Sequence, residues 1–207
     1  MTRIILASAS PRRRALLNAL GLDFEIAVSH AEDAEDFASP VDQGPAVIVK
    51  AHACVKRDDI VSRLDAPALV IAADTLVFLD EHVLGKPVDA SDARRMLSLL
   101  SGRTHQVYTG IAVTDTRVGR SAEGYECTDV TFRELSEAEI DRFVTAVNPV
   151  DRAGAYTVDG PGSLLVSGYD GCYQNVLGLP IVKLDTVLRE LGYSLFEMVN
   201  PEKCRFL

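Results

Sequence analysis

The sequence predicts an α/β fold with a mixed sheet. Strand-like apolar segments alternate with helical segments along the 207 residues, and this alternation is typical of helices packed on a sheet. Residues 69–79 form an almost unbroken apolar run, which indicates a central strand buried on both faces. Two later strand candidates follow each other without a helix between them, so their pairing could be antiparallel. These observations together favour a mixed sheet.

The N-terminus predicts a strand followed by a capped helix. We expect the strand over residues 3–7 and the helix over 11–20, where leucines recur at helical spacing. Ser10 suits the N-cap position, and Pro11 suits the first helical position because its fixed φ matches the helix. Gly21 is predicted to end the helix, since glycine readily adopts the left-handed conformation of a C-terminal cap.

The middle of the chain alternates further. A second strand is predicted over residues 24–28, followed by an acidic loop and a helix over 45–64. After the central strand, Asp89 is predicted to cap a helix whose apolar residues lie on one face. Two strands are then expected over 106–114 and 125–132.

The last third predicts one strong helix signal and a region of turns. Ser136 and Glu139 have the spacing of a capping box, and an apolar stripe follows them. Residues 154–173 are rich in Gly and Tyr, which predicts short strands and tight turns, and a last helix is expected over 180–191. Because no repeat or linker divides the chain, we expect residues 1–207 to form a single domain.

Composition limits the classes of ligand. The net charge of -9 would repel a nucleic-acid backbone. The basic clusters at 12–14 and 94–95 are large enough for one polyphosphate group but too short to follow a duplex. The four cysteines contain no C-x-x-C pair, which argues against a zinc site or a disulfide framework. With no signal-like or membrane-length apolar run, we expect a reducing, cytoplasmic location and no membrane partner.

The N-terminal turn is the first candidate site. Arg12, Arg13 and Arg14 fall in the first turn of a helix, where the helix dipole already disfavours cations. The arrangement becomes favourable if an anion binds there, held by free N–H groups, by guanidinium groups and by the hydroxyls of Ser8 and Ser10. This pattern predicts a phosphate site; the alternative is a solvated basic turn.

Asp74 is the second candidate. A carboxylate within a buried strand costs several kcal/mol unless it is paired, hydrogen-bonded or bound to a metal, so something must compensate it. The Asp74-Thr75 pair could coordinate a metal or activate water near the carboxyl end of a strand. The alternative is a buried Asp that caps a neighbouring turn. Lys86, in the rigid Gly85-Lys86-Pro87 turn, could present its ammonium to a phosphate.

Metal ligands are suggested by the acidic loop. Glu32 and Asp33 could supply oxygen ligands to Mg²⁺, which prefers carboxylates together with substrate phosphates. Glu35 and Asp36 nearby make a plain solvated acidic loop an equally good interpretation. None of the four histidines has a metal-ligand spacing, so each is predicted to be a surface or packing residue.

Several short motifs occur in a fixed order along the chain. They are Leu6-Ala7-Ser8-Ala9-Ser10-Pro11-Arg12-Arg13, Ala73-Asp74-Thr75, Gly85-Lys86-Pro87, Ser101-Gly102-Arg103-Thr104-His105, Tyr108-Thr109-Gly110, Val130-Thr131-Phe132, Ala153-Gly154-Ala155-Tyr156 and Gly178-Leu179-Pro180. Together they closely resemble the Maf family of nucleoside triphosphate pyrophosphatases over nearly the whole chain. The resemblance implies the fold of inosine triphosphate pyrophosphatases, an elongated mixed sheet flanked by helices, with two lobes and a cleft between them.

The resemblance also implies roles for individual residues. Asp74 matches the catalytic carboxylate that accepts a proton from the attacking water. The matching substrate-binding positions are four cations and two serines of the N-terminal loop, namely Arg12, Arg13, Lys50, Lys86, Ser8 and Ser10. Glu32 and Asp33 align with an acidic pair near a divalent metal ion, Mg²⁺ or Mn²⁺, with Asp33 at a position where Glu is frequent.

Substrate preference is implied by three positions. Arg12 and Thr75 resemble the branch that hydrolyses dTTP and UTP, since a second branch that prefers 7-methyl-GTP tends to carry Trp and Gln there. Asp159 departs from the first branch, which usually has Gln, and an ionised acid cannot donate the hydrogen bond that an amide can.

The expected function is therefore hydrolysis of dTTP-type or UTP-type nucleotides to the monophosphate and pyrophosphate, including removal of non-standard nucleotides. The alternatives are a 7-methyl-GTP pyrophosphatase and a non-catalytic nucleotide-binding regulator of cell division. The resemblance also allows a homodimer.

Overall fold

The computed structural model describes residues 2–31 and 44–205. Its strands form one seven-stranded sheet in the order β2-β1-β3-β5-β6-β7, with β4 paired to β3 outside that path. Strand β1 pairs in parallel with β2 and β3, whereas β3–β4 and β6–β7 are antiparallel. This confirms the predicted mixed α/β architecture. The chain divides into two compact units, and the single domain with a cleft between lobes stays a prediction.

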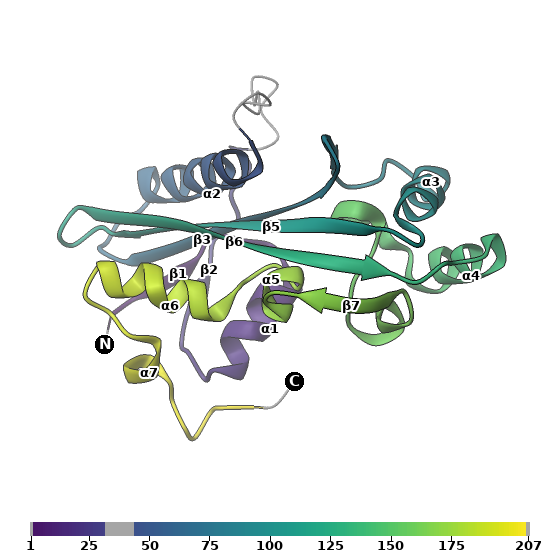
Figure 1. The fold of residues 1–207 in the computed structure, drawn as a ribbon. Helices are drawn as coiled ribbons and strands as arrows, with labels where there is room; N and C mark the ends of the chain where they lie inside the picture. Colours follow the sequence, from purple (N-terminus) through teal and green to yellow (C-terminus); the bar gives the residue numbers. More distant parts are fainter. Residues whose placement is uncertain (1, 32–43, 206–207) are drawn as a thin grey trace. The chain divides into compact units, whose positions relative to one another are not determined.

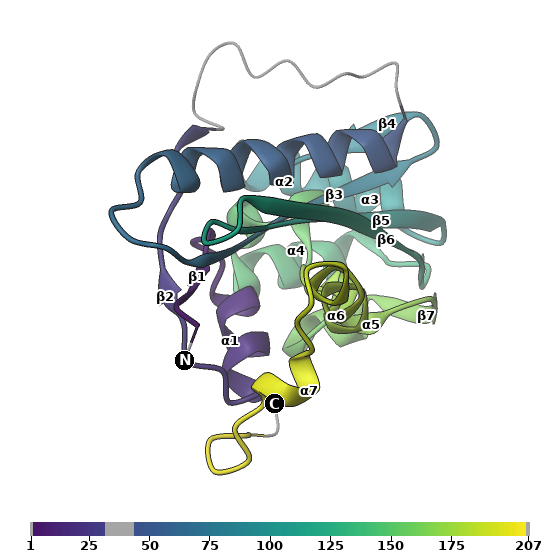
Figure 2. The ribbon, with the colours of Figure 1, turned by 90° about the vertical axis from the view of Figure 1, so that its left-hand side faces the viewer.

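The first unit comprises Met1–Asp74, Thr109–Glu126 and Gly178–Leu207. Its elements are β1 (Ile4–Leu6), α1 (Pro11–Ala19), β2 (Glu25–Ile26), α2 (Pro45–Ser62), α6 (Ile181–Glu190) and α7 (Leu195–Met198), together with parts of β3 (Leu69–Leu79), β5 (Thr104–Asp115) and β6 (Arg120–Phe132). Helix α2 covers one face of the strands, and α1 and α6 lie on the opposite face (Figures 1 and 2).

Parallel pairing aligns β1 with the first half of β3. Ile4 lies opposite Leu69 and Leu6 opposite Ile71, and the register continues through a bond from the Ala7 amide to the Ile71 carbonyl. The first six residues of β3 are all buried, as the apolar run predicts. Small and branched side chains from β1, β3, α2 and the residues that adjoin these strands form one cluster of this core: Ile5, Ala7, Ile60, Ala68, Val70 and Ala72.

Helix α1 has the predicted ends. The Ser10 hydroxyl accepts a hydrogen bond from the Arg13 amide, and Pro11 occupies the first turn. Gly21 follows the helix with φ 70°, a left-handed conformation that glycine adopts without steric penalty. A Cβ at this position would lie 2.5 Å from the Asn200 carbonyl oxygen, so the chain end also packs closely here.

Gly110 is where α2 approaches the sheet. A Cβ at Gly110 in β5 would lie 2.1 Å from the Val49 carbonyl oxygen and 2.6 Å from the Lys50 amide nitrogen. Both atoms belong to the backbone of α2, so only glycine allows helix and strand to lie this close. The contact fixes the position of the helix that carries several polar side chains of the candidate site.

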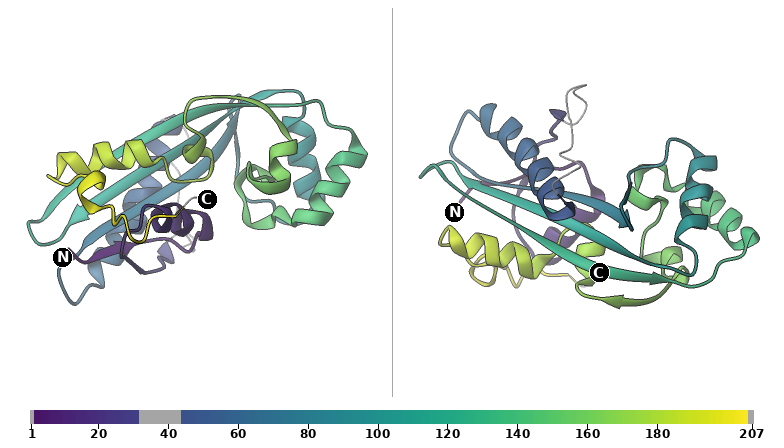
Figure 3. Two further views of the ribbon diagram at one scale, coloured as in Figure 1. Left: turned by 90° about the horizontal axis from the view of Figure 1, so that it is seen from below. Right: turned by 45° about the horizontal axis from the view of Figure 1, so that its top comes forward.

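The second unit comprises Thr75–Tyr108 and Cys127–Leu177. Besides the remaining parts of β3, β5 and β6, its elements are β4 (His82–Leu84), α3 (Ala90–Leu100), α4 (Glu137–Val147), the short 3-10 helices η3 (Pro149–Asp151), η4 (Ala153–Ala155) and η5 (Gly160–Leu164), β7 (Val166–Asp170) and α5 (Tyr173–Val176). Helices α3 and α4 lie side by side (Figure 3). The predicted capping box is present, since Ser136 and Glu139 each bond the other's backbone amide.

The predicted boundaries fail where elements are short or irregular. The 154–173 region holds two 3-10 helices and one strand rather than several strands, with Gly154 and Gly160 at positive φ. Strand β6 begins at Arg120, five residues before the predicted start. The helix expected to be last is followed by α7, a single turn too short to show an apolar stripe. Among the described helices, none combines the length and apolar character that crossing a membrane requires.

Candidate active site

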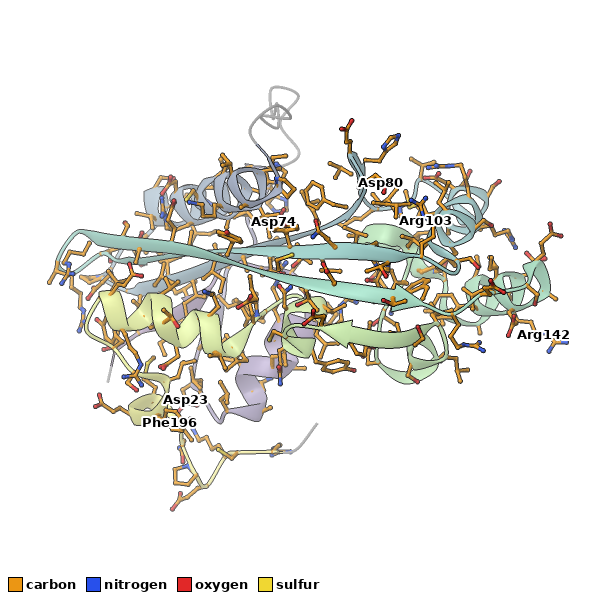
Figure 4. All side chains as sticks on the ribbon, in the orientation of Figure 1. Asp23, Asp74, Asp80, Arg103, Arg142 and Phe196 are labelled. Carbon is orange, nitrogen blue, oxygen red and sulfur yellow. The ribbon has the colours of Figure 1, made fainter. Side chains whose placement is uncertain are left out.

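Asp74 lies on β3 beside α2 and is held by two side chains of that helix (Figure 4). The Lys56 ammonium donates to Oδ1 at 2.6 Å, and the His52 Nδ1 donates to Oδ2 at 2.9 Å. All three residues are buried, with at most 9% of each exposed. The buried carboxylate is therefore compensated by side chains of α2, which answers the question that the sequence left open about Asp74.

The charge state of Asp74 follows from these contacts. Burial alone would raise the pKa of its carboxyl, but the hydrogen bond from His52 and the positive charges of Lys56 and Arg13 outweigh burial. The net result is a pKa well below the ordinary value of an aspartate. Asp74 is thus an anion over the whole physiological pH range.

Helix α2 delivers both partners from one face. His52 and Lys56 are four residues apart, and this spacing places their side chains on the same side of a helix. They interrupt an otherwise apolar stripe that includes Val49, Ala53 and Ile60, all buried against the strands. A polar pair at stripe positions must find polar partners on the sheet, and Asp74 supplies them.

The N-terminal loop forms a second polar cluster. The buried Arg13 donates from Nε to the Gly178 carbonyl at 2.7 Å and from Nη1 to the Ser8 hydroxyl at 3.1 Å. The Ser8 hydroxyl also accepts a hydrogen bond from the Ser10 amide. Two nitrogens of the Arg13 guanidinium thus hold the N-terminal loop against the segment that precedes α6. The positive charge of Arg13 also lowers the pKa of Asp74.

The topology explains why the two clusters belong to one site. Strands β1 and β3 run in parallel, and β3 continues beyond the point where β1 ends, so the carboxyl end of β1 lies beside the middle of β3. Ser8 follows the end of β1, and Asp74 lies three residues beyond Ile71, the last residue of β3 that pairs with β1. Ligands gather at such a strand end in open α/β sheets, and α1 begins there with its N-terminus.

Lys50 lies six residues before Lys56 on α2 but has a different partner. Its ammonium pairs with Glu123 of β6 at 2.9 Å, and the Cys54 thiol donates to the other oxygen of that carboxylate at 3.0 Å. The hydrogen bonds from Cys54 and Lys50 lower the pKa of Glu123. Burial and the Glu123 contact raise the pKa of Cys54 to about 11, so this cysteine is a neutral thiol rather than a reactive thiolate.

The remaining predicted residues are distributed between the units. Arg12 is partly exposed at the start of α1 in the first unit. Thr75, Lys86 and Asp159 belong to the second unit. Lys86 is exposed, and the exposed Asp159 accepts a hydrogen bond from the Thr157 hydroxyl. The first unit therefore brings together Ser8, Ser10, Arg13 and Asp74. The roles of all the predicted site residues, these four included, stay predictions.

The described residues offer few ligands for the predicted divalent ion. Glu32 and Asp33 lie outside the described residues. Across residues 2–31 and 44–205, no cluster of three acidic, histidine or cysteine side chains is suited to hold a metal ion. Both oxygens of Asp74 already accept hydrogen bonds, one of them from an ammonium. As arranged, the described residues do not form a divalent-metal site.

Two members of the site were missed in the sequence. The histidine spacing predicts a surface or packing role for His52, but its ring bonds Asp74. No sequence motif points to Lys56, whose ammonium also bonds Asp74. The signal that could have found both is their position within the buried stripe of α2, because a polar residue on that face requires a buried partner.

Comparison with known proteins now identifies the family. The family model described as Maf-like protein matches residues 3–191 of this chain. The chain belongs to the Maf family. A dTTP/UTP pyrophosphatase of Alkaliphilus oremlandii is 46% identical to this Maf-family chain over 191 residues, covering 91% of the chain and 96% of that protein. A protein of the same name from Moorella thermoacetica is 44% identical over 199 residues, covering 96% and 100%.

A solved structure is also similar, at a greater distance. It is a nucleoside-triphosphatase / dITP/XTP pyrophosphatase from Mycobacterium abscessus, with 13% identity, a TM-score of 0.40, and coverage of 97% of this chain and 100% of that chain. At this level of likeness nothing about the activity of the Maf-family chain follows from it.

Proposed function

We propose that this chain is a nucleoside triphosphate pyrophosphatase that cuts dTTP-type and UTP-type nucleotides to the monophosphate and pyrophosphate. The observation that carries the proposal is a buried, ionised Asp74 beyond the end of β1, where the Ser8–Arg13 loop and the start of α1 also lie. Perturbed buried carboxylates cluster at active sites. The relatives named dTTP/UTP pyrophosphatase support the reaction and the substrate.

Each predicted site residue has a function in this scheme. The N-terminus of α1 offers amide groups and a positive dipole end to phosphate oxygens. Arg12 and Lys50 contribute positive charge that stabilises the charge developing on the triphosphate in the transition state. Asp74 orients a water molecule for attack on the α-phosphorus and takes its proton, while pyrophosphate leaves. Lys86 and Asp159 are proposed to bind phosphate and base.

The proposal includes a divalent cation, Mg²⁺ or Mn²⁺. Such an ion neutralises phosphate charge and is commonly held by one or two carboxylates together with the substrate. Glu32, Asp33 and Asp74 would supply the carboxylates, the first two from outside the described residues. The described residues alone do not fit the ion, so each of the chemical steps above is assigned to the chain itself.

The experiment that tests the proposal measures pyrophosphate release from dTTP, UTP, CTP, 7-methyl-GTP and purine triphosphates, with Mg²⁺, Mn²⁺ or EDTA. We expect Asp74→Asn to lower kcat by at least about 10²-fold, the contribution of one general base. Asp80→Asn is the matched control, because Asp80 pairs with Arg103 on the surface of the second unit (Figure 4). A folded Asp74→Asn variant with wild-type turnover would refute the assignment.

Substrate choice within this chemistry depends on Asp159. The Asp159 carboxylate accepts from Thr157, and an ionised acid offers no donor to a base carbonyl. If Asp159 contacts the base, Asp159→Gln should change the ratio of kcat/KM between dTTP and 7-methyl-GTP. An unchanged ratio would place base recognition elsewhere.

A non-catalytic nucleotide-binding regulator, including one that acts in septum formation, is the second candidate. It predicts tight nucleotide binding without release of pyrophosphate in any metal condition. The ionised Asp74 favours the enzyme, because a protein that only binds triphosphate gains nothing from a buried anion at the phosphate site. A cytoplasmic location and a homodimer also belong to the proposal; sedimentation of the purified chain tests the latter.

A further inference from the structure

Arg152 is a largely buried cation whose side chain lacks hydrogen bonds that buried cations normally make. It lies between η3 and η4 in the second unit, and 21% of its side chain is exposed. Its Nε and Nη1 atoms are buried, and neither donates a hydrogen bond to an acceptor of the described residues. A guanidinium is always charged and carries five N–H donors. Burial therefore leaves donors of a charged group unsatisfied here.

Asp151 does not satisfy these donors. Its Oδ1 lies 3.6 Å from the Arg152 Nε, which is longer than a hydrogen bond, and the Asp151 side chain is 62% exposed. An ion pair at this distance and open to water contributes little to stability. The carboxylate therefore leaves Nε and Nη1 of Arg152 without an acceptor.

Other arginines that pack into the fold show what a structural role requires. Arg13 donates from Nε to the Gly178 carbonyl at 2.7 Å, and Arg133, in the same unit as Arg152, donates from Nε to the Leu164 carbonyl at 2.6 Å. A side chain that only held its own loop would donate to backbone in the same way. Because Arg152 does not, an acceptor from outside the chain is indicated. A buried water molecule is the alternative acceptor.

A second cation belongs to the adjoining loop of the same unit. The Gly154 amide donates to the Gly85 carbonyl at 3.0 Å, and this bond joins the loop after Arg152 to the Gly-Lys-Pro turn. Lys86 is exposed and directly follows the bonded carbonyl, while Arg152 precedes the bonded amide by two residues. The second unit therefore carries two cations on loops that are hydrogen-bonded to each other.

These two cations suit a ligand with several phosphate groups. A guanidinium can make two parallel hydrogen bonds to one phosphate, and an ammonium adds a compact charge that attracts another. Pyrophosphate carries several negative charges on adjoining groups, so it can contact both cations at once. Because Nε and Nη1 of Arg152 make no hydrogen bond to the described residues, the side chain can turn toward an anion without breaking one there.

We propose that Arg152 is a phosphate-binding residue that, together with Lys86, binds the pyrophosphate portion of a nucleoside triphosphate. The guanidinium packs into the second unit with unsatisfied donors, and the oxygens of the two terminal phosphates supply the acceptors. The same contacts hold pyrophosphate after the bond to the α-phosphorus is cut. The inference rests on the proposed function in that it takes pyrophosphate as the leaving group.

The test measures the Kd of inorganic pyrophosphate for the full-length protein by calorimetry at pH 8, with EDTA and without nucleotide. Arg152→Met should raise this Kd at least about tenfold, because hydrogen bonds between charged groups are lost. The Kd of dTMP should stay close to the wild-type value, because dTMP lacks the two terminal phosphates. Arg142→Met is the matched control, since it removes the same charge from the exposed surface of α4 in the same unit (Figure 4). It should leave both Kd values unchanged, because salt screens an exposed charge.

Asp151→Asn tests the same site with the opposite sign. It removes the carboxylate that lies 3.6 Å from the Arg152 Nε, so pyrophosphate should bind more tightly. Glu137→Gln is its control, because it neutralises an exposed carboxylate of α4. The largely exposed Asp151 side chain can be replaced without disturbing the core, so this variant decides the question if Arg152→Met does not fold. Thermal melting shows which variants are folded.

Four results would overturn the inference. The first is a wild-type pyrophosphate Kd in folded Arg152→Met, which is expected if a buried water is the acceptor. The second is an equal loss of affinity for dTMP, which would show a general loss of positive potential. The third is an unchanged pyrophosphate Kd in Asp151→Asn, and the fourth is equal tightening by Asp151→Asn and Glu137→Gln.

These outcomes are separate from those of the proposed function, because pyrophosphate binding is measured without turnover. Intact pyrophosphatase activity with an unchanged pyrophosphate Kd in Arg152→Met would overturn only the assignment of Arg152. Binding of pyrophosphate that depends on Arg152, in a protein that hydrolyses no nucleotide, would uphold Arg152 as a phosphate-binding residue and overturn the enzyme.

Discussion

Replacement of Gly110 by alanine is expected to displace α2 from the sheet. The added Cβ would lie 2.1 Å from the Val49 carbonyl oxygen, whereas an ordinary close carbon–oxygen contact is about 3.3 Å. Helix and strand must therefore separate by about 1.2 Å, the difference between these distances. The obstacle is backbone of α2 on one side and of β5 on the other, so no side-chain rotation can relieve it.

The cost follows from this displacement. Overpacking a well-filled core costs about 1–3 kcal/mol, and we expect about 3 kcal/mol because the obstacle is backbone. For a chain of this size a loss of 1 kcal/mol lowers Tm by about 2–4 °C, so Gly110→Ala should lower it by roughly 6–12 °C. The shift also moves His52 and Lys56 away from Asp74, and a misplacement near 1 Å can reduce kcat/KM by about 10²-fold.

Calorimetry and urea unfolding measure the stability, and pyrophosphate release measures the activity. Gly168→Ala is the matched control, since Gly168 also lies in a strand but its added Cβ would have no atom within 4 Å. We expect this control to change stability by less than about 1 kcal/mol. If Gly110→Ala has the same Tm as Gly168→Ala, the close approach of α2 to β5 does not position the helix, and the reasoning is refuted.

Two further predictions concern other buried polar groups. Burial lowers the pKa of His105 from 6.5 to about 4. As the pH drops from 6.5 to 4, the unfolded chain therefore binds a proton that the folded chain does not. The free energy of unfolding should decrease by about 3 kcal/mol in total over this drop in pH. His105→Gln should flatten unfolding free energy against pH between these values; an unchanged slope would contradict it. Arg13→Lys keeps the charge but cannot make both bonds to Gly178 and Ser8, so it should lose about 1–3 kcal/mol in urea unfolding. A midpoint equal to wild type would show that the two bonds do not brace the loop.

The fold was largely predictable because its main elements carry local signals. The apolar run corresponds to β3. The N-caps predicted at Ser10 and Asp89 and the capping box predicted at Ser136 correspond to the starts of α1, α3 and α4. The missed elements, β4, α5 and α7, have three or four residues each, too few for a hydrophobic period to develop. The 3-10 turns near Gly154 and Gly160 depend on positive φ values that composition does not specify.

The site was predictable only where a residue conflicts with its own segment. Asp74 stands out because a carboxylate interrupts an apolar strand, and the three arginines stand out because the first turn of a helix disfavours cations. The Arg13 contact with Gly178 joins residues 165 positions apart, and such a pairing follows from topology rather than from any local pattern. The sequence indicated a charged residue in need of partners without indicating which partners it has.

His52 and Lys56 show where this limit lies. On a helix of ordinary polar content, a histidine and a lysine attract no attention, since such residues usually face solvent. Their meaning changes once the stripe of Val49, Ala53 and Ile60 is known to face the sheet, because the same face then buries an ammonium. A buried ammonium requires an anion, and β3 offers Asp74 within 2.6 Å. A carboxylate in an apolar strand and a lysine in an apolar helix face therefore explain each other. The pairing can be recognised only when the positions of both elements in the fold are known.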